Sequence, residues 1–336
     1  MPNRDLDNIL VEYEQQRRIA EVDLEKRKKE LYNKQPRLLE IEDEINKISI
    51  NKTKSILLNE MTNKLEAKFN NDLNKLKDEQ VRLLKKENLT LDFFKPKYKC
   101  TKCNDTGFIK FENQKTQMCT CLKQKLIDIS YNKSNLSNLQ KENFYNFNEN
   151  IFSDEINEKK YKMNISPREN IINIKNASIN FVKKFDDINT KNLFFTGNTG
   201  LGKTYMTNCI ANELIKQGKI VLYQTAPVLL ETIIDNKFTK YKTTDTNDFY
   251  NQVLTADLLI IDDLGTEYQN SLKLSELFTI LNTRALNLNN KLTRTIISSN
   301  LSIEKIFEVY EERIGSRIAG FYDIYYFFGE DLRLCK

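Results

Sequence analysis

The glycine-rich stretch from Gly197 to Thr204 constrains this chain more than any other feature. It has the pattern Gly-x4-Gly-Lys-Thr, follows the apolar run 193–195 and precedes a helix-like segment, 205–217. This order of strand, glycine-rich loop and helix is the context that a phosphate-binding loop requires. Glycine permits backbone conformations that turn successive N–H groups toward one anion, and the positive end of the helix points to the same place. A glycine turn beside a surface lysine is the plain alternative, which the match at all four constrained positions disfavours.

The residues of this loop are the predicted nucleotide-binding residues. They are Gly197, Asn198, Thr199, Gly200, Leu201, Gly202, Lys203 and Thr204. We expect Lys203 to reach the β- and γ-phosphates of ATP and the Thr204 hydroxyl to bind Mg²⁺.

Two carboxylates follow a second apolar run about sixty residues later. Residues 258–261 are Leu-Leu-Ile-Ile, and Asp262 and Asp263 come directly after them. Such a run predicts a buried parallel strand that delivers an acid to its C-terminal end, where sheets of this kind bind ligands. We expect Asp262 to hold Mg²⁺ and Asp263 to polarise the attacking water. Asn300 ends another buried strand, 293–300, and is expected to sense the γ-phosphate or orient the water.

Arg313 and Arg317 lie four residues apart on one face of a predicted helix. One interpretation is a solvated helix with ion pairs to Glu311 and Glu312. The other is an arginine finger, which enters the ATP site of a neighbouring subunit and offsets the charge on the transferred phosphoryl group. The sequence does not say which of the two arginines would be the finger.

Four of the six cysteines have the pattern Cys100-x2-Cys103-x15-Cys119-x-Cys121. Clustered cysteines in a reducing compartment favour a metal over disulfides, and four thiolates suit tetrahedral Zn²⁺. We expect a structural, zinc-ribbon-like element, with residues 105–107 as a tight turn. A pair of buried or redox-active thiols is the alternative. The chain contains no histidine, so no histidine ligand or base is available.

The first 95 residues predict a helical arm. The segment 6–87 is rich in Glu, Lys, Leu and Ile and contains no glycine. Pro36 is expected to separate one helix from the next, and the pair Asn70-Asn71 to mark a further break. We expect two or three helices in an antiparallel bundle or a coiled hairpin. A solvated spacer and a partner-docking surface fit this segment equally well.

These patterns divide the chain into a helical arm at 1–95, a cysteine element at 96–128, a linker at 129–165 and an ATPase domain at 166–336. The ATPase domain is expected to be a three-layer α/β domain with a mostly parallel sheet. Within it, 236–247 is predicted to be a polar loop whose lysines, Lys237, Lys240 and Lys242, are candidates for contact with single-stranded DNA. A formal net charge of +5 permits such contact. With no apolar run near the roughly 20 residues of a membrane span, and no signal peptide, a cytoplasmic protein is expected.

The part from about residue 165 to the end resembles the AAA+ ATPases of the DnaC/DnaI helicase-loader and IstB transposition-ATPase group. The resemblance rests on the glycine-rich loop, Ile-Asp-Asp-Leu-Gly-Thr-Glu at 261–267, Ser-Asn-Leu-Ser at 299–302, Glu-Arg-x3-Arg-Ile at 312–318 and Gly-Glu-Asp-x-Arg at 329–333. It implies a sensor-one role for Asn300, a finger role for Arg313 or Arg317 and a sensor-two role for Arg333. The family usually has threonine where this chain has Ser299. It also implies a core that works without a helical lid, since only three residues follow Arg333.

The cysteine element resembles the zinc-bearing N-terminal region of the DnaI-type loaders. Together the two resemblances imply an ATP-dependent loader of the hexameric replicative DNA helicase. In such a loader the arm would hold the helicase, the ATPase domain would contact single-stranded DNA, and ATP would promote self-association. Two alternatives stay open: an IstB-like ATPase that regulates transposition, and an ATP-gated adaptor with little hydrolysis, because Asp263 is a poorer base than the more usual glutamate.

Overall fold

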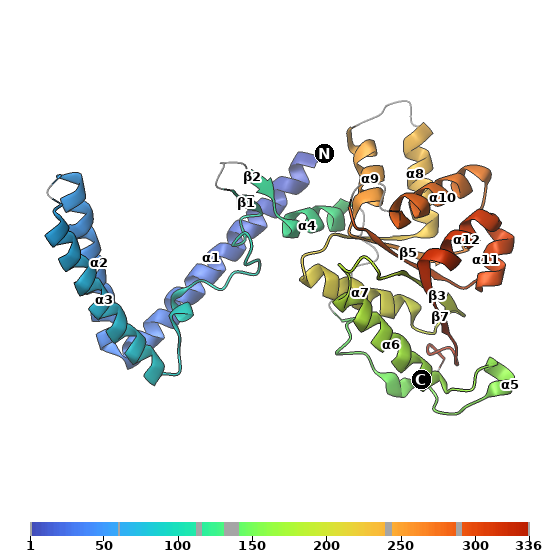
Figure 1. The fold of residues 1–336 in the computed structure, drawn as a ribbon, viewed down its shortest axis with the longest axis horizontal. Coiled ribbons are helices and arrows are strands. Elements are labelled where there is room, and N and C mark those ends of the chain that lie inside the picture. Colours follow the sequence, from blue (N-terminus) through green and yellow to red (C-terminus); the bar gives the residue numbers. More distant parts are fainter. Residues whose placement is uncertain are drawn as a thin grey trace. The chain divides into compact units, whose positions relative to one another are not determined.

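The computed structural model describes residues 2–59, 61–111, 116–130, 141–238, 244–286 and 291–334. The chain divides into two compact units, Met1–Cys119 and Thr120–Lys336 (Figure 1). None of the helices in these described ranges combines the length and the apolar character that crossing a membrane requires.

The first unit is a helical arm followed by a small hairpin. Its elements are α1 (Pro2–Lys34), α2 (Pro36–Leu57), α3 (Asn63–Lys86), the 3-10 helix η1 (Leu91–Phe94) and the antiparallel strands β1 (Phe108–Lys110) and β2 (Thr116–Met118). The expected break at Pro36 is confirmed, because this proline is the first residue of α2. The expected break at 70–71 is wrong. Helix α3 runs through both asparagines, whose cost in a helix interior is modest.

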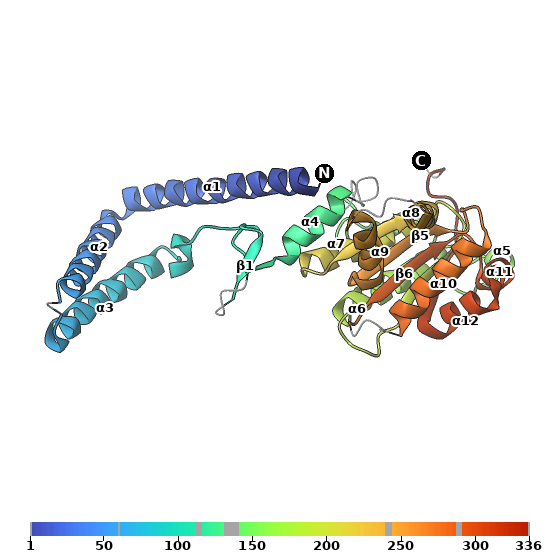
Figure 2. The ribbon, with the colours of Figure 1, turned by 90° about the horizontal axis from the view of Figure 1, so that it is seen from above.

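Helices α2 and α3 lie side by side and form the expected antiparallel hairpin (Figures 1 and 2). The turn between them ends at Thr62, whose side chain accepts a hydrogen bond from the Leu65 amide at 3.3 Å. Arg37 of α2 donates through Nε to Glu79 of α3 at 2.9 Å. A second bond, from Nη2 to Glu79 at 3.2 Å, makes this ion pair bidentate, although the exposure of the Arg37 side chain, 39%, limits what it contributes to stability.

The second unit is an α/β domain with a five-stranded sheet. Its strands are β3 (Asn192–Gly197), β4 (Val221–Thr225), β5 (Leu258–Leu264), β6 (Arg294–Ser299) and β7 (Tyr322–Phe327). Its helices are α4 (Thr120–Ser130), η2 (Glu149–Ile151), α5 (Glu158–Tyr161), α6 (Pro167–Lys183), α7 (Lys203–Lys216), α8 (Ala226–Phe238), α9 (Thr244–Thr255), α10 (Ser271–Ala285), α11 (Ile303–Val309) and α12 (Glu311–Phe321).

The strand order is β4-β5-β6-β3-β7, and all four pairs are parallel. Alternate strand residues enter two separate apolar clusters, as parallel strands covered on both faces require. Phe194 packs with α8 to α12 on one face, whereas Leu193 and Phe195 pack with α6 and α7 on the other. The predicted three-layer domain with a parallel sheet is therefore confirmed.

Helix α4 covers the free edge of β4. The Gln124 side chain donates through Nε2 to the Val221 carbonyl at 2.9 Å and accepts through Oε1 from the Val221 amide at 2.7 Å. The carboxamide thus makes the two bonds that a further strand would make, and it is 5% exposed. This helix directly follows Cys119, and it packs with the ATPase sheet although the sequence patterns grouped it with the cysteines.

Two connecting segments differ from the simple linkers or loops that their composition indicates. In the expected linker, 129–165, Phe147 and Phe152 are buried in the apolar cluster that contains residues of α6 and α7, and residues 131–140 lie outside the described residues. The predicted loop at 236–247 is also partly wrong. Helix α8 continues to Phe238 and α9 begins at Thr244, so only 239–243 separates them.

Candidate nucleotide site and cysteine cluster

The glycine-rich loop joins β3 to α7 and leaves no room for side chains at its first and middle glycines. Gly197 has φ +140°, and a Cβ there would lie 2.1 Å from the Phe327 carbonyl oxygen. At Gly200 (φ +78°) a Cβ would lie 1.8 Å from Oδ1 of Asp331. The positive φ values favour glycine at both positions, and the backbone contact at Gly197 requires it, whereas the Asp331 side chain near Gly200 could move. Of the other loop residues, Asn198 and Thr199 are exposed at the tip and Leu201 is buried.

The Lys203 ammonium lies inside this loop. It donates to the carbonyl oxygens of Gly197 at 2.6 Å and Asn198 at 2.7 Å, and to Oδ1 of Asn300 at 2.8 Å. Burial lowers the pKa of Lys203 to about 8, against the opposing effect of Asp263 and Asp262. The Lys203 ammonium is therefore placed to pair with an anion bound in the loop.

Thr204 and Asp262 meet where the sequence predicts a magnesium site. The Thr204 hydroxyl donates to Oδ2 of Asp262 at 3.1 Å. Neighbouring ligands of an octahedral Mg²⁺, each about 2.1 Å from the ion, are separated by about 2.9 Å. The two oxygen atoms therefore fit one magnesium coordination shell with little movement.

Two buried hydroxyl groups orient the Asp262 carboxylate. Tyr223 on β4 donates to Oδ2, and Ser298 on β6 donates to Oδ1. No local sequence pattern marks either residue. Each sits inside an apolar strand, and only the register of β4, β5 and β6 brings its hydroxyl to Asp262.

Asp263 lies at an irregularity of β5. The pairing of β5 with β6 shifts register between Ile261 and Leu264, and Asp263 has φ +56°. Such a bulge re-aims side chains at the end of a strand. Burial and then the Asp262 charge raise the pKa of Asp263, whereas Lys203 and Arg333 lower it.

Asn300 follows β6, the strand between β3 and β5. Its amide oxygen accepts from Lys203, so three neighbouring strands deliver Lys203, Asn300 and Asp262 to one end of the sheet. This is the edge at which parallel sheets bind ligands. Arg333 lies near this group. Its backbone amide donates to Oδ1 of Asp331 at 3.0 Å, and its side chain is 69% exposed.

The two candidate finger residues make their described contacts elsewhere, on α10 and α12. The guanidinium groups of Arg313 and Arg317 lie 5.0 Å and 5.8 Å from the centre of the same Phe278 ring. Arg317 also donates through Nε to Asn282 at 2.8 Å, and Arg313 forms an ion pair with Glu311 at 2.8 Å. Of the lysines expected near DNA, Lys237 pairs with Glu276 at 2.5 Å, and Lys240 and Lys242 lie outside the described residues.

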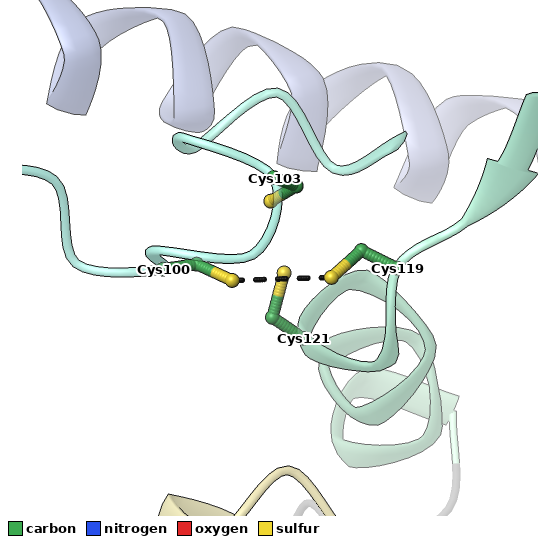
Figure 3. A group of neighbouring side chains, drawn as sticks. All are labelled: Cys100, Cys103, Cys119 and Cys121. Atoms are coloured by element: carbon green, nitrogen blue, oxygen red, sulfur yellow. Dashed lines mark hydrogen bonds between the residues drawn. The ribbon is translucent and has the colours of Figure 1, made fainter. Parts of the chain in front are cut away.

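The four predicted zinc ligands form one cluster (Figure 3). The sulfur atoms of Cys100, Cys103, Cys119 and Cys121 all lie within 4.8 Å of one another, and those of Cys100 and Cys119 are 3.9 Å apart. Four thiolates about 2.3 Å from a tetrahedral zinc would be about 3.8 Å apart. The cysteines are not joined by disulfides, so the donor set and its spacing fit a metal.

Asp105 holds the first loop of this cluster. Its carboxylate accepts from the backbone amides of Cys100 at 2.7 Å and Lys99 at 2.9 Å, and the side chain is 3% exposed. The turn lies slightly earlier than the expected 105–107, because the Thr106 amide donates to the Cys103 carbonyl at 3.1 Å and so closes a turn over 103–106. Hydrogen bonds of this kind, from backbone amides to a carboxylate, orient metal-binding loops.

Known proteins resemble the second unit. Residues 168–321 match the family model of the bacterial DnaA ATPase domain. The chromosomal replication initiator protein DnaA of Buchnera aphidicola subsp. Cinara cedri is 29% identical over 131 residues, which are 37% of this chain and 28% of that protein. DnaA of Aliarcobacter butzleri is 33% identical over 72 residues, 21% of this chain and 16% of that protein. The chain thus spans less than a third of these relatives.

Solved structures that are similar to part of this chain include a DnaC helicase loader and DnaI. The DnaC structure has a TM-score of 0.42 and 20% identity, and the match covers 55% of this chain and 98% of that one. The DnaI structure has a TM-score of 0.41 and 22% identity, with 56% and 94% covered.

Proposed function

We propose that the chain is an ATP-dependent loader of the replicative DNA helicase, with residues 168–321, which match the family model of the bacterial DnaA ATPase domain, as its ATPase part. The observation that supports ATP chemistry most strongly is the meeting of Lys203, Asn300 and Asp262 at one end of the sheet. The loader role rests on the resemblance of both parts of the sequence to DnaC/DnaI-type proteins.

In this proposal the loop amides and Lys203 hold the β- and γ-phosphates, and Thr204 and Asp262 hold the magnesium ion. The ion, when bound, neutralises charge on the phosphate oxygens. Asp263 accepts a hydrogen bond from the attacking water, and Asn300 orients that water. Asp263 is suited to this by its position beside Asp262, at the bulge of β5 that re-aims its side chain.

We propose self-association from the position of the two arginines. Arg313 and Arg317 make their described contacts on α10 and α12, so we assign the finger to a site in a second copy of the chain. A guanidinium that approaches the γ-phosphate from outside offsets the charge that develops during transfer. ATP would then promote the contact between copies, and hydrolysis would release it.

The cysteine cluster is assigned to a structural Zn²⁺. All four positions are thiolates, which leaves no open position for a substrate or a water. The zinc would stabilise a stretch with very little apolar core of its own.

The helical arm is the proposed contact with the helicase, and its tip offers exposed apolar side chains. Ile56, Leu57 and Leu58 at the end of α2 are 54%, 77% and 66% exposed. The test is retention of the purified replicative helicase on the immobilised full-length chain, with and without magnesium-ATP. The wild type should retain it, and a variant with serine at these three positions should not. Ile188→Ser, which removes an apolar side chain that is 76% exposed in the second unit, is the matched control.

The result that contradicts the loader role is a wild type that retains no helicase in either condition. If that same protein instead forms ATP-dependent filaments on DNA, the transposition ATPase is favoured.

A further inference from the structure

Glu267 is a buried carboxylate close to the nucleotide site that no predicted step uses. It lies in the turn after β5 and is 7% exposed. Its Oε2 accepts from the Gly265 amide at 2.9 Å, and its Oε1 accepts from the hydroxyl group of Tyr310. A buried carboxylate is costly unless it has such partners, so this pair ties two segments together.

Tyr310 stands at the start of the arginine-bearing helix. It is fully buried and is the residue before α12, whose N-terminus has no side-chain cap. Arg313 and Arg317 follow it within two turns. The hydroxyl bond to Glu267 therefore fixes the end of α12 from which both arginines project.

The turn that holds Glu267 also contacts the segment after Asn300. Gly265 has φ +107°, and a Cβ there would lie 2.8 Å from Cδ1 of Leu301. The Ser299 hydroxyl donates to the Leu264 carbonyl at 2.5 Å. Leu301 directly follows Asn300, whose side chain accepts a hydrogen bond from Lys203. A continuous set of contacts therefore connects the phosphate-binding loop, through this turn, with α12.

We propose that Glu267 and Tyr310 are positioning residues that fix α12 against the turn of the nucleotide site, so that its arginines are presented correctly to a neighbouring copy. The inference rests on the proposed function, because it needs a finger that acts between copies. This role explains why Glu267, five residues after Asp262, is buried although neither of its described hydrogen bonds comes from a cation.

The test compares two tyrosine variants of the full-length chain. Tyr310→Phe removes only the hydroxyl that reaches Glu267 and keeps the ring in the core. Tyr322→Phe is the matched control, because Tyr322 is 3% exposed in the same apolar cluster. The readouts are the affinity for a fluorescent ADP analogue, and kcat and KM for ATP as functions of protein concentration.

In Tyr310→Phe we expect nucleotide affinity and KM to stay within about twofold. We expect kcat at high protein concentration to fall about tenfold or more, because a catalytic group misplaced by about 1 Å can cost roughly 100-fold. Tyr322→Phe should keep the wild-type kcat. Glu267→Gln, which retains an acceptor oxygen, should lose less activity than Glu267→Ala.

A mixing experiment locates the defect in the chain that supplies the arginine. Asp263→Asn chains are expected to bind ATP without turning it over, so they would serve as donors of α12 only. Added in excess to Tyr310→Phe, they should restore turnover, whereas donors that carry both substitutions should not.

Equal rescue by the two donors, or wild-type kcat in Tyr310→Phe, would overturn the inference while leaving the finger in place. Equal losses in the two tyrosine variants would overturn it too, since they would show a general effect on the core. If the wild type binds nucleotide but its turnover does not depend on protein concentration, the finger itself falls, and this inference falls with it.

Discussion

Replacing Gln124 with leucine is expected to destabilise the second unit by about 2–4 kcal/mol. Gln124 makes two buried hydrogen bonds with Val221, at 2.9 Å and 2.7 Å, on the edge strand β4. Leucine has nearly the same volume, so it leaves no large cavity, but it can make neither bond. Losing a buried hydrogen bond costs about 1–2 kcal/mol when the partner group stays in an apolar environment, and two are lost here.

Urea unfolding measured by circular dichroism gives the change in free energy, and hydrogen exchange of the Val221 amide shows where it arises. Tryptophan fluorescence cannot be used because the chain has no tryptophan. Asp128→Asn is the control. It alters the Asp128 carboxylate, which accepts from Gln124 at 2.7 Å, without touching Val221, and should change stability by less than about 1 kcal/mol.

The reasoning is refuted if Gln124→Leu unfolds at the same urea concentration as the wild type and still protects the Val221 amide from exchange.

Three further predictions concern the site residues. Asp263→Asn should keep nucleotide affinity but lower turnover by about 100-fold or more, because it removes a general base. Phosphate release measures this, and retained turnover would place the base elsewhere. The pKa of Lys203 is about 8 without nucleotide, and bound phosphates should raise it. Binding should therefore take up protons at about pH 8.5 but not at about pH 6.5, where the group is already charged in both states. Calorimetry in buffers of different ionisation enthalpy measures this, and Lys203→Arg should abolish the uptake. The protein should contain about one zinc per chain, and Asp105→Ala should weaken zinc binding by about 10- to 100-fold; a native protein with freely titratable thiols and no zinc would contradict the cluster.

Features with a fixed local spacing could be predicted from the sequence. The glycine-rich loop, the apolar strand that carries Asp262 and the four cysteines each depend on residue types at set distances along the chain. The structure has all three, although β5 continues past Asp262 to Leu264. The helices on both faces follow from the apolar periodicity of their segments.

Buried polar contacts between distant segments could not be predicted. Gln124 and Val221 are 97 residues apart, and Tyr310 and Glu267 are 43 apart. Arg284 is fully buried and donates to the carbonyl oxygens of Val253 and Arg294, although its charge gives no sign of burial in the sequence. Which polar side chain is buried depends on the partner that the fold supplies, and no local pattern encodes that partner.

Binding of magnesium-ATP at Lys203 is tested most directly by isothermal titration of the full-length chain with ATP, with and without Mg²⁺. We predict one site per chain, tighter with magnesium because Thr204 and Asp262 hold the ion, and no detectable binding in Lys203→Ala. Binding that Lys203→Ala retains in full, or a folded wild type that takes up no adenine nucleotide, would contradict the nucleotide site.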